Sequence, residues 1–352
     1  MNSRERVNLA LKHKEPDTVP IHDTVWQATI DRWRTEGLPP GVLPADYFGF
    51  ELAGFWADSS PRYPIEIIRQ DNEFIVERDS FGQTRKNYRD FSTTPMIIDY
   101  ACKNRNDWKK IKSNLKADYY RVDWVSSYRS FQRQQSLGKF IVYEAVVGYE
   151  KILRYMAPEQ LLKLVLTDPE WVKDMYLTDA KLSMKMCDLM MDAGFVFDGA
   201  FLYCDLGYRK GLMFSPKHYE EQLNPVFKEL CSYFHNKKMP VILHSDGQVK
   251  DLIPLFIEAG IDCLQPLEVK AKMDVIDLKS KYGDKISFMG GIDVRLMELE
   301  DLKPLEKEIK KKITAAKEGG GYIYHSDHSI PKNVGFKHYR KIIDLVKKYG
   351  KY

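Results

Sequence analysis

Short apolar runs alternate with charged, helix-like stretches from about residue 139 to the end of the chain. The runs that predict strands are residues 140–147, 195–203, 240–243, 263–266, 286–289 and 321–324. Between them lie amphipathic stretches such as 248–259 and 302–317, the first of which is followed by Gly260, a residue that favours the end of a helix. Strand followed by helix, repeated, predicts βαβ units and a parallel sheet.

The length of this repeating region favours a closed (β/α)8 TIM barrel over an open sheet. Repeats of roughly 20 to 50 residues add up to a run near the ~250 residues usual for such a barrel. A doubly wound open sheet is the alternative, but no Gly-x-Gly-x-x-Gly turn follows an early strand, and polar residues end many strands. In a barrel, all these strand ends meet at one mouth.

The segment before about residue 110 has a different pattern. Residues 3–13 predict an amphipathic helix with Ser3 as its N-cap, and Pro16 ends it. Residues 74–78 and 84–88 flank the turn 79–83 and predict a β-hairpin. The rest is rich in Pro, Gly, Tyr and Trp and predicts an irregular N-terminal cap. Because no linker divides the chain, we expect one domain over residues 1–352.

Composition narrows the classes of partner and compartment. The 54 basic and 50 acidic side chains leave a net charge of +4, which predicts neither nucleic acid nor membrane as a partner. The charged N-terminus lacks the apolar core of a signal peptide, so we expect a cytoplasmic protein. Five cysteines at irregular spacing, without a C-x-x-C pair, predict reduced and mostly buried thiols.

Two groups of polar residues follow predicted strands and are candidates for chemistry. His244 and Asp246 lie two residues apart at a strand end and therefore point the same way, which suits two metal ligands or a base with its orienting carboxylate. The same pair also fits a helix N-cap at Asp246 and a backbone-bonded histidine. The second group is His325-Ser326-Asp327-His328. Two imidazoles and a carboxylate are a common ligand set for a catalytic zinc.

Further candidates lie near other strand ends. Glu144 stands in a run too apolar to hold a carboxylate unless it is paired, metal-bound or facing a cavity. Asp293 follows two glycines, which indicate strained backbone or close approach to a substrate. The others, for which turn or surface positions are the alternative, are His22, Asp205, Tyr208, Arg209 and Glu268.

Several segments, in order and over nearly the full length, share a family pattern. They are residues 4–20, Asp205-Leu206-Gly207-Tyr208, residues 240–247, residues 257–262, Gln265-Pro266-Leu267-Glu268, Gly290-Gly291-Ile292-Asp293 and the final glycine-rich strand. Together they resemble the uroporphyrinogen decarboxylase superfamily. The resemblance implies a (β/α)8 barrel. It also implies either a decarboxylase or a zinc-dependent methyltransferase that works with a corrinoid protein.

Departures from the family patterns separate these branches. Decarboxylases carry a Met-Arg-Gln-Ala-Gly-Arg segment whose arginines hold the substrate carboxylates, but residues 21–28 contain no arginine. Methyltransferases that serve coenzyme M use His-x-Cys and a later Cys as zinc ligands. Here His244 matches the histidine, Asp246 stands at the first cysteine and His328 falls near the second. A harder ligand set is better suited to polarising an oxygen than to activating a thiol.

The resemblance therefore implies a zinc-dependent methyltransferase that takes a methyl group from a small methoxylated donor, an O-demethylase. The acceptor is a corrinoid carried by a partner protein. Zinc ligands are expected at His244, Asp246 and His328, with Glu144 as a possible fourth. Asp205, Tyr208 and Asp293 are expected to be catalytic. The expected substrate contacts are His22, Glu144, Glu268 and Arg209.

Three alternatives remain open at this point. One is transfer from a methylcorrinoid to a thiol of the coenzyme M type. Another is a metal-independent lyase in which Asp205 and Tyr208 stabilise a protonated pyrrole-like intermediate. The third is a scaffold protein that keeps the barrel without the chemistry. The aromatic residues of the cap would shelter an aromatic donor or simply pack as core; they are Trp26, Trp33, Tyr47, Phe48, Phe50, Phe55 and Trp56.

Overall fold

A parallel sheet of seven strands forms the centre of the protein in a computed structural model that describes residues 1–89 and 95–352. Every neighbouring pair in the sheet is parallel. The strands, in spatial order, are β1 (Leu52–Trp56), β6 (Phe140–Val146), β7 (Gly199–Tyr203), β10 (Val241–His244), β11 (Cys263–Gln265), β12 (Ser287–Met289) and β13 (Tyr322–Ile323).

A short extended segment around Ile21 takes the eighth strand position. Ile21 forms a parallel bridge with Tyr324, just after β13. The backbone N–H of Glu51, just before β1, donates to the carbonyl of Ile21 at 2.8 Å. Backbone contacts thus join the first and last strands of the sheet, and the predicted (β/α)8 barrel is confirmed.

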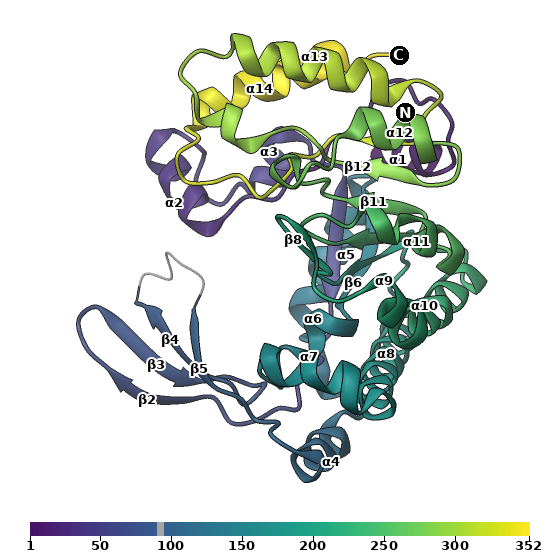
Figure 1. The fold of residues 1–352 in the computed structure, drawn as a ribbon. Helices are drawn as coiled ribbons and strands as arrows, with labels where there is room; N and C mark the ends of the chain where they lie inside the picture. Colours follow the sequence, from purple (N-terminus) through teal and green to yellow (C-terminus); the bar gives the residue numbers. More distant parts are fainter. Residues whose placement is uncertain (90–94) are drawn as a thin grey trace.

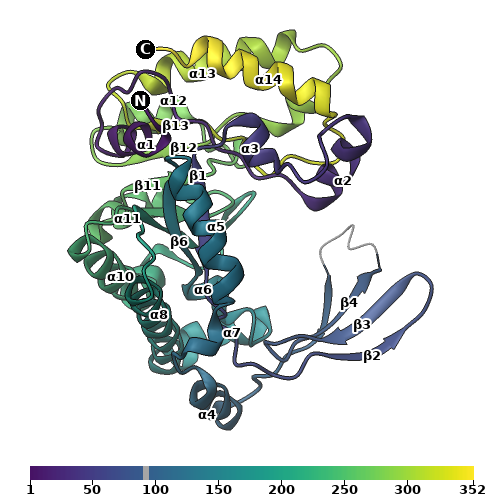
Figure 2. The ribbon, with the colours of Figure 1, turned by 180° about the vertical axis from the view of Figure 1, so that it is seen from behind.

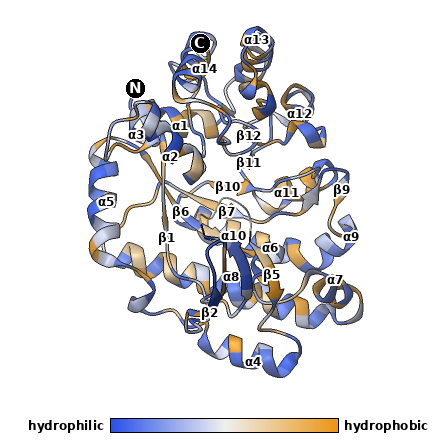
Figure 3. Ribbon diagram, turned by 90° about the vertical axis from the view of Figure 1, so that its left-hand side faces the viewer, coloured by the Kyte–Doolittle hydropathy of each residue, from blue (hydrophilic) through white to orange (hydrophobic). Residues whose placement is uncertain are grey.

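Most of the helices lie around the outside of the barrel (Figure 1). The longer ones are α2 (Gln27–Glu36), α4 (Arg105–Asn114), α5 (Trp124–Ser136), α7 (Pro158–Thr167), α8 (Pro169–Asp192), α10 (Asn224–Asn236), α12 (Val275–Tyr282), α13 (Lys303–Lys317) and α14 (Phe336–Tyr349). Shorter ones are α3 (Pro44–Phe48), α6 (Gly148–Ile152), α9 (Pro216–His218) and α11 (Ile253–Ala259). Their hydrophobic and hydrophilic residues are interspersed along each helix (Figure 3), as expected when one stripe packs on the sheet.

Helix α1 (Ser3–Leu11) closes the N-terminal end of the barrel. Its buried residues Val7, Ala10 and Leu11 cluster with side chains inside the barrel, among them Phe140 and Ile323. The N-cap is Asn2 rather than Ser3, because the Asn2 side chain accepts from the backbone N–H of Glu5 in a capping box. With this end plugged, the C-terminal ends of the strands form the mouth available for function.

Two predicted elements begin later than their apolar patterns do. Within the run 195–203, only Gly199–Tyr203 form a strand, β7. The run is apolar before that point because Phe195 and Phe197 pack in the core outside the strand. The helix predicted over 248–259 starts as a 3-10 turn at Lys250–Leu252 and becomes α11 from Ile253, with Pro254 in its first turn. Proline favours that position because its missing N–H would be unpaired there.

The N-terminal cap is more regular than predicted. Four strands form an antiparallel sheet that projects from one side of the barrel (Figures 1 and 2): β2 (Glu66–Gln70), β3 (Phe74–Arg78), β4 (Thr84–Tyr88) and β5 (Met96–Asp99). The predicted hairpin is confirmed, with Phe74 opposite Tyr88. Its turn is held by Asp79, whose carboxylate accepts from the backbone N–H groups of Phe81 (2.9 Å) and Gln83 (3.0 Å).

The structure also describes the state of the cysteines and the apolar character of the helices. All five cysteines are buried and free, as predicted. Among the described helices, none is both long enough and apolar enough to cross a membrane.

Candidate active site

Neighbouring strands β7 and β10 bring three potential ligands together at the barrel mouth. Tyr203 and His244 are paired in register, so Asp205 and Asp246, each just beyond its strand, come side by side. The Nε2 atom of His244 lies 3.5 Å from an oxygen of Asp205 and 3.8 Å from an oxygen of Asp246. One ligand atom from each residue lies within 4.8 Å of the other two. This spacing is compatible with one shared metal ion.

The Asp246 carboxylate carries the strongest sign that a cation belongs here. Its Oδ1 atom is buried and has no hydrogen-bond partner among the described residues. Burial raises the pKa of Asp246, and the neighbouring carboxylates of Asp205 and Glu268 add to the rise, whereas His244 opposes it. A buried anion next to other anions is costly unless a cation compensates it. The donor set of one imidazole and two carboxylates fits zinc.

Gln265, at the end of β11, orients the imidazole of His244. Its Oε1 accepts from Nδ1 of His244 at 2.6 Å, so that the lone pair of Nε2 faces the two aspartates. Sequence reasoning missed this residue as a site residue. The available signal was its place at a strand end beside His244, where the two residues are in register.

Glu150, at the start of α6, holds Asp205, the third residue of the ligand group, in place. Its carboxylate accepts from the backbone N–H of Asp205 at 3.2 Å. Burial raises the pKa of Glu150, with a further contribution from Asp205. It lies within a helix rather than at a strand end, so the strand pattern did not reveal it.

His328 is not part of the described group of ligands. Its ring lies 6.0 Å from that of Trp26, at the entrance to α2. The group formed instead contains Asp205, which the sequence predicted as catalytic rather than as a ligand. The charge of His328 still acts on Asp246 and lowers the pKa of that carboxyl, so His328 lies near the group. Its assignment to zinc stays a prediction.

The rest of the His325-Ser326-Asp327-His328 segment builds a buried network. Ser326 donates to the carboxylate of Asp23, which also accepts from the hydroxyl of Tyr339 at 2.7 Å. His325 lies 3.6 Å from the same carboxylate, and its Nε2 faces the side-chain amide of Gln265 at 3.3 Å. The ring of His22 lies 5.9 Å from that of His325, and desolvation lowers the pKa of His22 to about 3. His22 is therefore a neutral imidazole near this network.

The Glu144 side chain points from β6 into space that is free because the adjacent strand β1 has a glycine there. A Cβ atom at Gly54, on the adjacent strand, would lie 2.0 Å from the Glu144 carboxyl carbon. The hydroxyl of Tyr203 donates to the carboxylate at 3.2 Å, and the Tyr203 ring lies 5.1 Å from that of His244. Desolvation raises the pKa of Glu144 to about 7. Tyr203 thus lies next to both Glu144 and His244, and it connects Glu144 to the group of His244, Asp205 and Asp246.

Replacing Glu144 with glutamine is expected to raise stability at high pH. Since the folded pKa of about 7 exceeds the ordinary value of 4.5, the folded protein loses stability as the pH rises from about 4.5 to about 7. Glu144→Gln removes this loss and should raise the free energy of unfolding at pH 8 by about 1–3 kcal/mol. Urea denaturation at pH 4.5 and pH 8 measures it; an equal effect at both values would contradict the desolvation argument.

The other predicted site residues have different surroundings. Glu268 is buried, accepts from the backbone N–H of Gly247 at 3.0 Å and pairs with Lys270 at 2.6 Å, so it holds the turn after Asp246. Both oxygens of Asp293 pair with Arg295, at 2.8 and 2.6 Å.

Tyr208 and Arg209 are exposed at the hairpin of β8 (Gly207–Tyr208) and β9 (Gly211–Leu212). The carbonyl of Tyr208 accepts from the backbone N–H of Gln248 at 3.0 Å, so this hairpin packs beside the turn that follows β10. The described contacts thus place both residues near the mouth. Their roles in catalysis and substrate binding stay predictions.

The cap aromatics divide into two groups. Trp33, Phe48, Phe50 and Phe55 are buried in the core, which matches the packing alternative. Trp56 is 52% exposed and stacks on Tyr203, with ring centroids 5.5 Å apart and planes at 14°. Trp26 is also exposed. Tyr47 is exposed as well, so within this set Trp26, Tyr47 and Trp56 are free to contact a ligand.

Comparison with known proteins places this barrel in a family. A profile described as uroporphyrinogen decarboxylase (URO-D) matches residues 92–349. The chain belongs to the URO-D family. This match includes the barrel strands from β6 to β13 and therefore the group of Asp205, His244 and Asp246.

One solved structure has the same fold as the URO-D protein over the full length. A methyltransferase from Methanosarcina mazei is similar over 99% of both chains, with a TM-score of 0.69 at 13% identity. A putative alpha-L-fucosidase from Bacteroides thetaiotaomicron aligns over 95% of this chain and 94% of its own, with a TM-score of 0.40 at 10% identity. No curated protein sequence matches the chain.

Proposed function

We propose that this URO-D family protein is a zinc-dependent methyltransferase that takes a methyl group from a methoxylated aromatic donor. The acceptor is a corrinoid carried by a partner protein. The observation that carries the proposal is the oxygen-rich ligand group of Asp205, His244 and Asp246 at the mouth of the barrel. Such a set is harder than a thiolate set and suits an oxygen-bearing substrate.

The cysteines support this choice of donor over a thiol. Cys204 directly precedes Asp205, but it is buried, and burial raises the pKa of its thiol far above the usual range. The other four cysteines are buried as well. None is therefore placed to offer a thiolate to a metal at the mouth.

The residues of the mouth have separate tasks in this proposal. Zinc held by Asp205, His244 and Asp246 would supply a Lewis acid that polarises the ether oxygen of the donor. Gln265 holds the His244 imidazole in the tautomer that presents Nε2. The exposed face of Trp56, supported by Tyr203, offers a surface for an aromatic ring. The Methanosarcina structure, described as a methyltransferase, is consistent with this class of reaction.

The test is zinc analysis combined with a methyl-transfer assay. Protein purified without added metal should contain near-stoichiometric zinc. It should convert free cob(I)alamin to methylcobalamin when supplied with methoxylated aromatic compounds, a change followed by absorbance. Methylation of a thiol by methylcobalamin, without demethylation of any ether, would favour the coenzyme M type of reaction instead. A metal-free protein that still folds would overturn the zinc mechanism and favour the lyase.

Replacing Gln265 with leucine is expected to weaken zinc binding by about 10- to 100-fold without unfolding the protein, because the His244 ring loses the acceptor that orients it. Competition with a chelator of known affinity measures the change, with the melting temperature as a control. Gln265→Glu keeps an acceptor for Nδ1 and should retain most of the affinity. Equal zinc affinity in wild type and Gln265→Leu would show that the amide does not support the site.

A further inference from the structure

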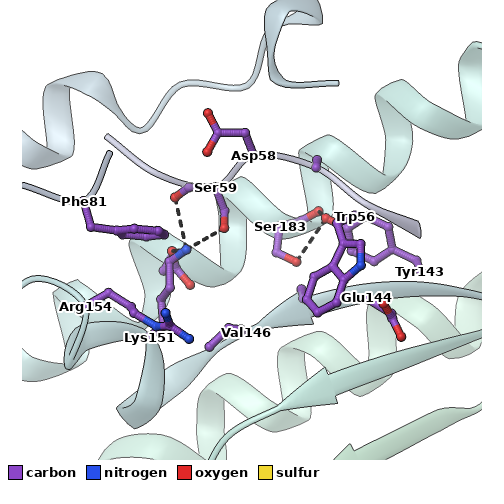
Figure 4. A pocket seen from close by; sticks show the side chains of 13 residues that line it. Trp56, Asp58, Ser59, Phe81, Tyr143, Glu144, Val146, Lys151, Arg154 and Ser183 are labelled. Atoms are coloured by element: carbon purple, nitrogen blue, oxygen red, sulfur yellow. Dashed lines mark hydrogen bonds and ion pairs between the residues drawn. The ribbon is translucent and has the colours of Figure 1, made fainter. Parts of the chain in front are cut away.

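We propose that a pocket beside the barrel mouth binds a carboxylate on the substrate, so that the methyl donor is a single-ring methoxylated aromatic acid. This inference rests on the proposed function, since it names the substrate class of the same site. The pocket has a volume of about 240 Å³ and lies where β1, β6, α6 and α8 meet (Figure 4). A cavity of ~150 Å³ is enough to hold benzene, so one substituted ring fits.

Arg154, just after α6, is the cation that would receive the carboxylate. Among the described residues its guanidinium donates no hydrogen bond, and its one ion pair, with Glu150, is long at 3.8 Å. The side chain is 43% exposed, and its charge lies 5.9 Å from the ring of Phe81. A guanidinium with unused donors matches a carboxylate in a two-pronged geometry.

Two other charges of the lining, on Lys151 and Asp58, have closer partners than Arg154 has. Lys151 donates to the carbonyl and hydroxyl of Ser59, at 3.1 and 2.5 Å, and lies 3.6 Å from the carboxylate of Asp179. Asp58 lies 3.6 Å from the guanidinium of Arg62. Within the described lining, Arg154 is therefore the charge most available to a ligand.

The two ends of the pocket differ in character. In Figure 4, Phe81 and Arg154 lie at one end, and Trp56 and Glu144 lie at the other. Trp56 stacks on Tyr203, whose ring lies 5.1 Å from that of His244. A ring anchored by its carboxylate at Arg154 would therefore extend along Trp56 and direct its opposite substituent toward the mouth.

The projecting sheet of β2 to β5 contributes one side of the pocket. Phe81 belongs to the turn between β3 and β4, and its ring lies 5.8 Å from that of Tyr155. Gln83 in the same turn donates to the carbonyl of Leu153 at 2.9 Å. The N-terminal segment thus supplies one wall of the pocket and fixes it to the loop that carries Arg154.

Calorimetric titration with 4-methoxybenzoate and its neutral analogue 4-methoxybenzamide tests the proposal. Wild type should bind the benzoate at least about tenfold more tightly than the amide. Arg154→Gln should remove that preference and leave amide binding unchanged, whereas Trp56→Ala should weaken both probes alike. Arg129→Gln, which removes an exposed arginine on α5, is the matched control. Equal affinity of wild type for the two probes, or a preference that survives Arg154→Gln, would overturn the pocket assignment.

Measuring the same binding in His244→Ala separates this inference from the proposed function. Benzoate binding that depends on Arg154 in both backgrounds, without methyl transfer by wild type, would sustain the pocket and refute the methyltransferase. Methyl transfer from neutral methoxybenzenes, without any dependence on Arg154, would refute the pocket assignment and sustain the methyltransferase.

Discussion

Replacing Lys151 with methionine is expected to lower the free energy of unfolding by about 3–5 kcal/mol at pH 8. The side chains of Lys151 and Asp179 are 1% and 2% exposed, and their charged atoms lie 3.6 Å apart between α6 and α8. Desolvation raises the pKa of Asp179 to about 6 and lowers that of Lys151. Without the lysine, the carboxylate stays buried without a cation, and its desolvation is uncompensated.

The defect should depend on pH in a defined direction. Asp179 has a folded pKa above its ordinary value of 3.8, so the folded state binds the extra proton and loses stability as the pH rises from about 3.8 to about 6. Removal of Lys151 raises the folded pKa further and extends this window upward. The variant should therefore be closest to wild type near pH 5 and furthest from it at pH 8.

Chemical denaturation at several pH values measures both effects. The double variant Lys151→Met, Asp179→Leu is the control, because it removes the buried anion together with its partner and should recover most of the lost stability. A single-variant defect that is the same at pH 5 and pH 8, or that the second substitution does not relieve, would contradict the buried-pair argument.

Replacing His244 or Asp246 is expected to abolish most of the methyl-transfer activity. His244→Ala and Asp246→Ala should each reduce bound zinc to a small fraction of the wild-type content. Methyl transfer from the methoxylated aromatic donor should fall by at least about 10³-fold, because a catalytic metal with one protein ligand missing is held weakly and in the wrong geometry. Elemental analysis and the cobalamin absorbance assay measure the two effects.

The zinc content of the Asp205→Ala and His328→Ala variants identifies the third zinc ligand. Asp205→Ala should lose zinc like His244→Ala, since Asp205 lies 3.5 Å from Nε2 of His244. His328→Ala should retain zinc, because His328 lies outside the group of three residues whose ligand atoms come together. Loss of zinc in His328→Ala with retention in Asp205→Ala would restore the ligand set that the sequence pattern implied.

The sequence by itself determined the fold class and the location of the site. Alternating apolar runs and amphipathic stretches specified parallel strands, because strands buried on both faces read as continuous apolar runs and the stretches between them read as helices. The polar residues after those runs, such as His244 and Asp246, specified the mouth, since the ends of parallel strands meet there. The hairpin around residues 79–83 followed from local turn chemistry.

Only the tertiary structure decided which of these residues meet. The partnership of Asp205 with His244 depends on the register between β7 and β10, and the role of Gln265 depends on the register of β11. The pocket at Arg154 joins Phe81, Trp56 and α6 from three distant parts of the chain. Spacing along a chain specifies direction and periodicity, whereas proximity across a barrel depends on strand order and side-chain packing. These arise when the whole core forms.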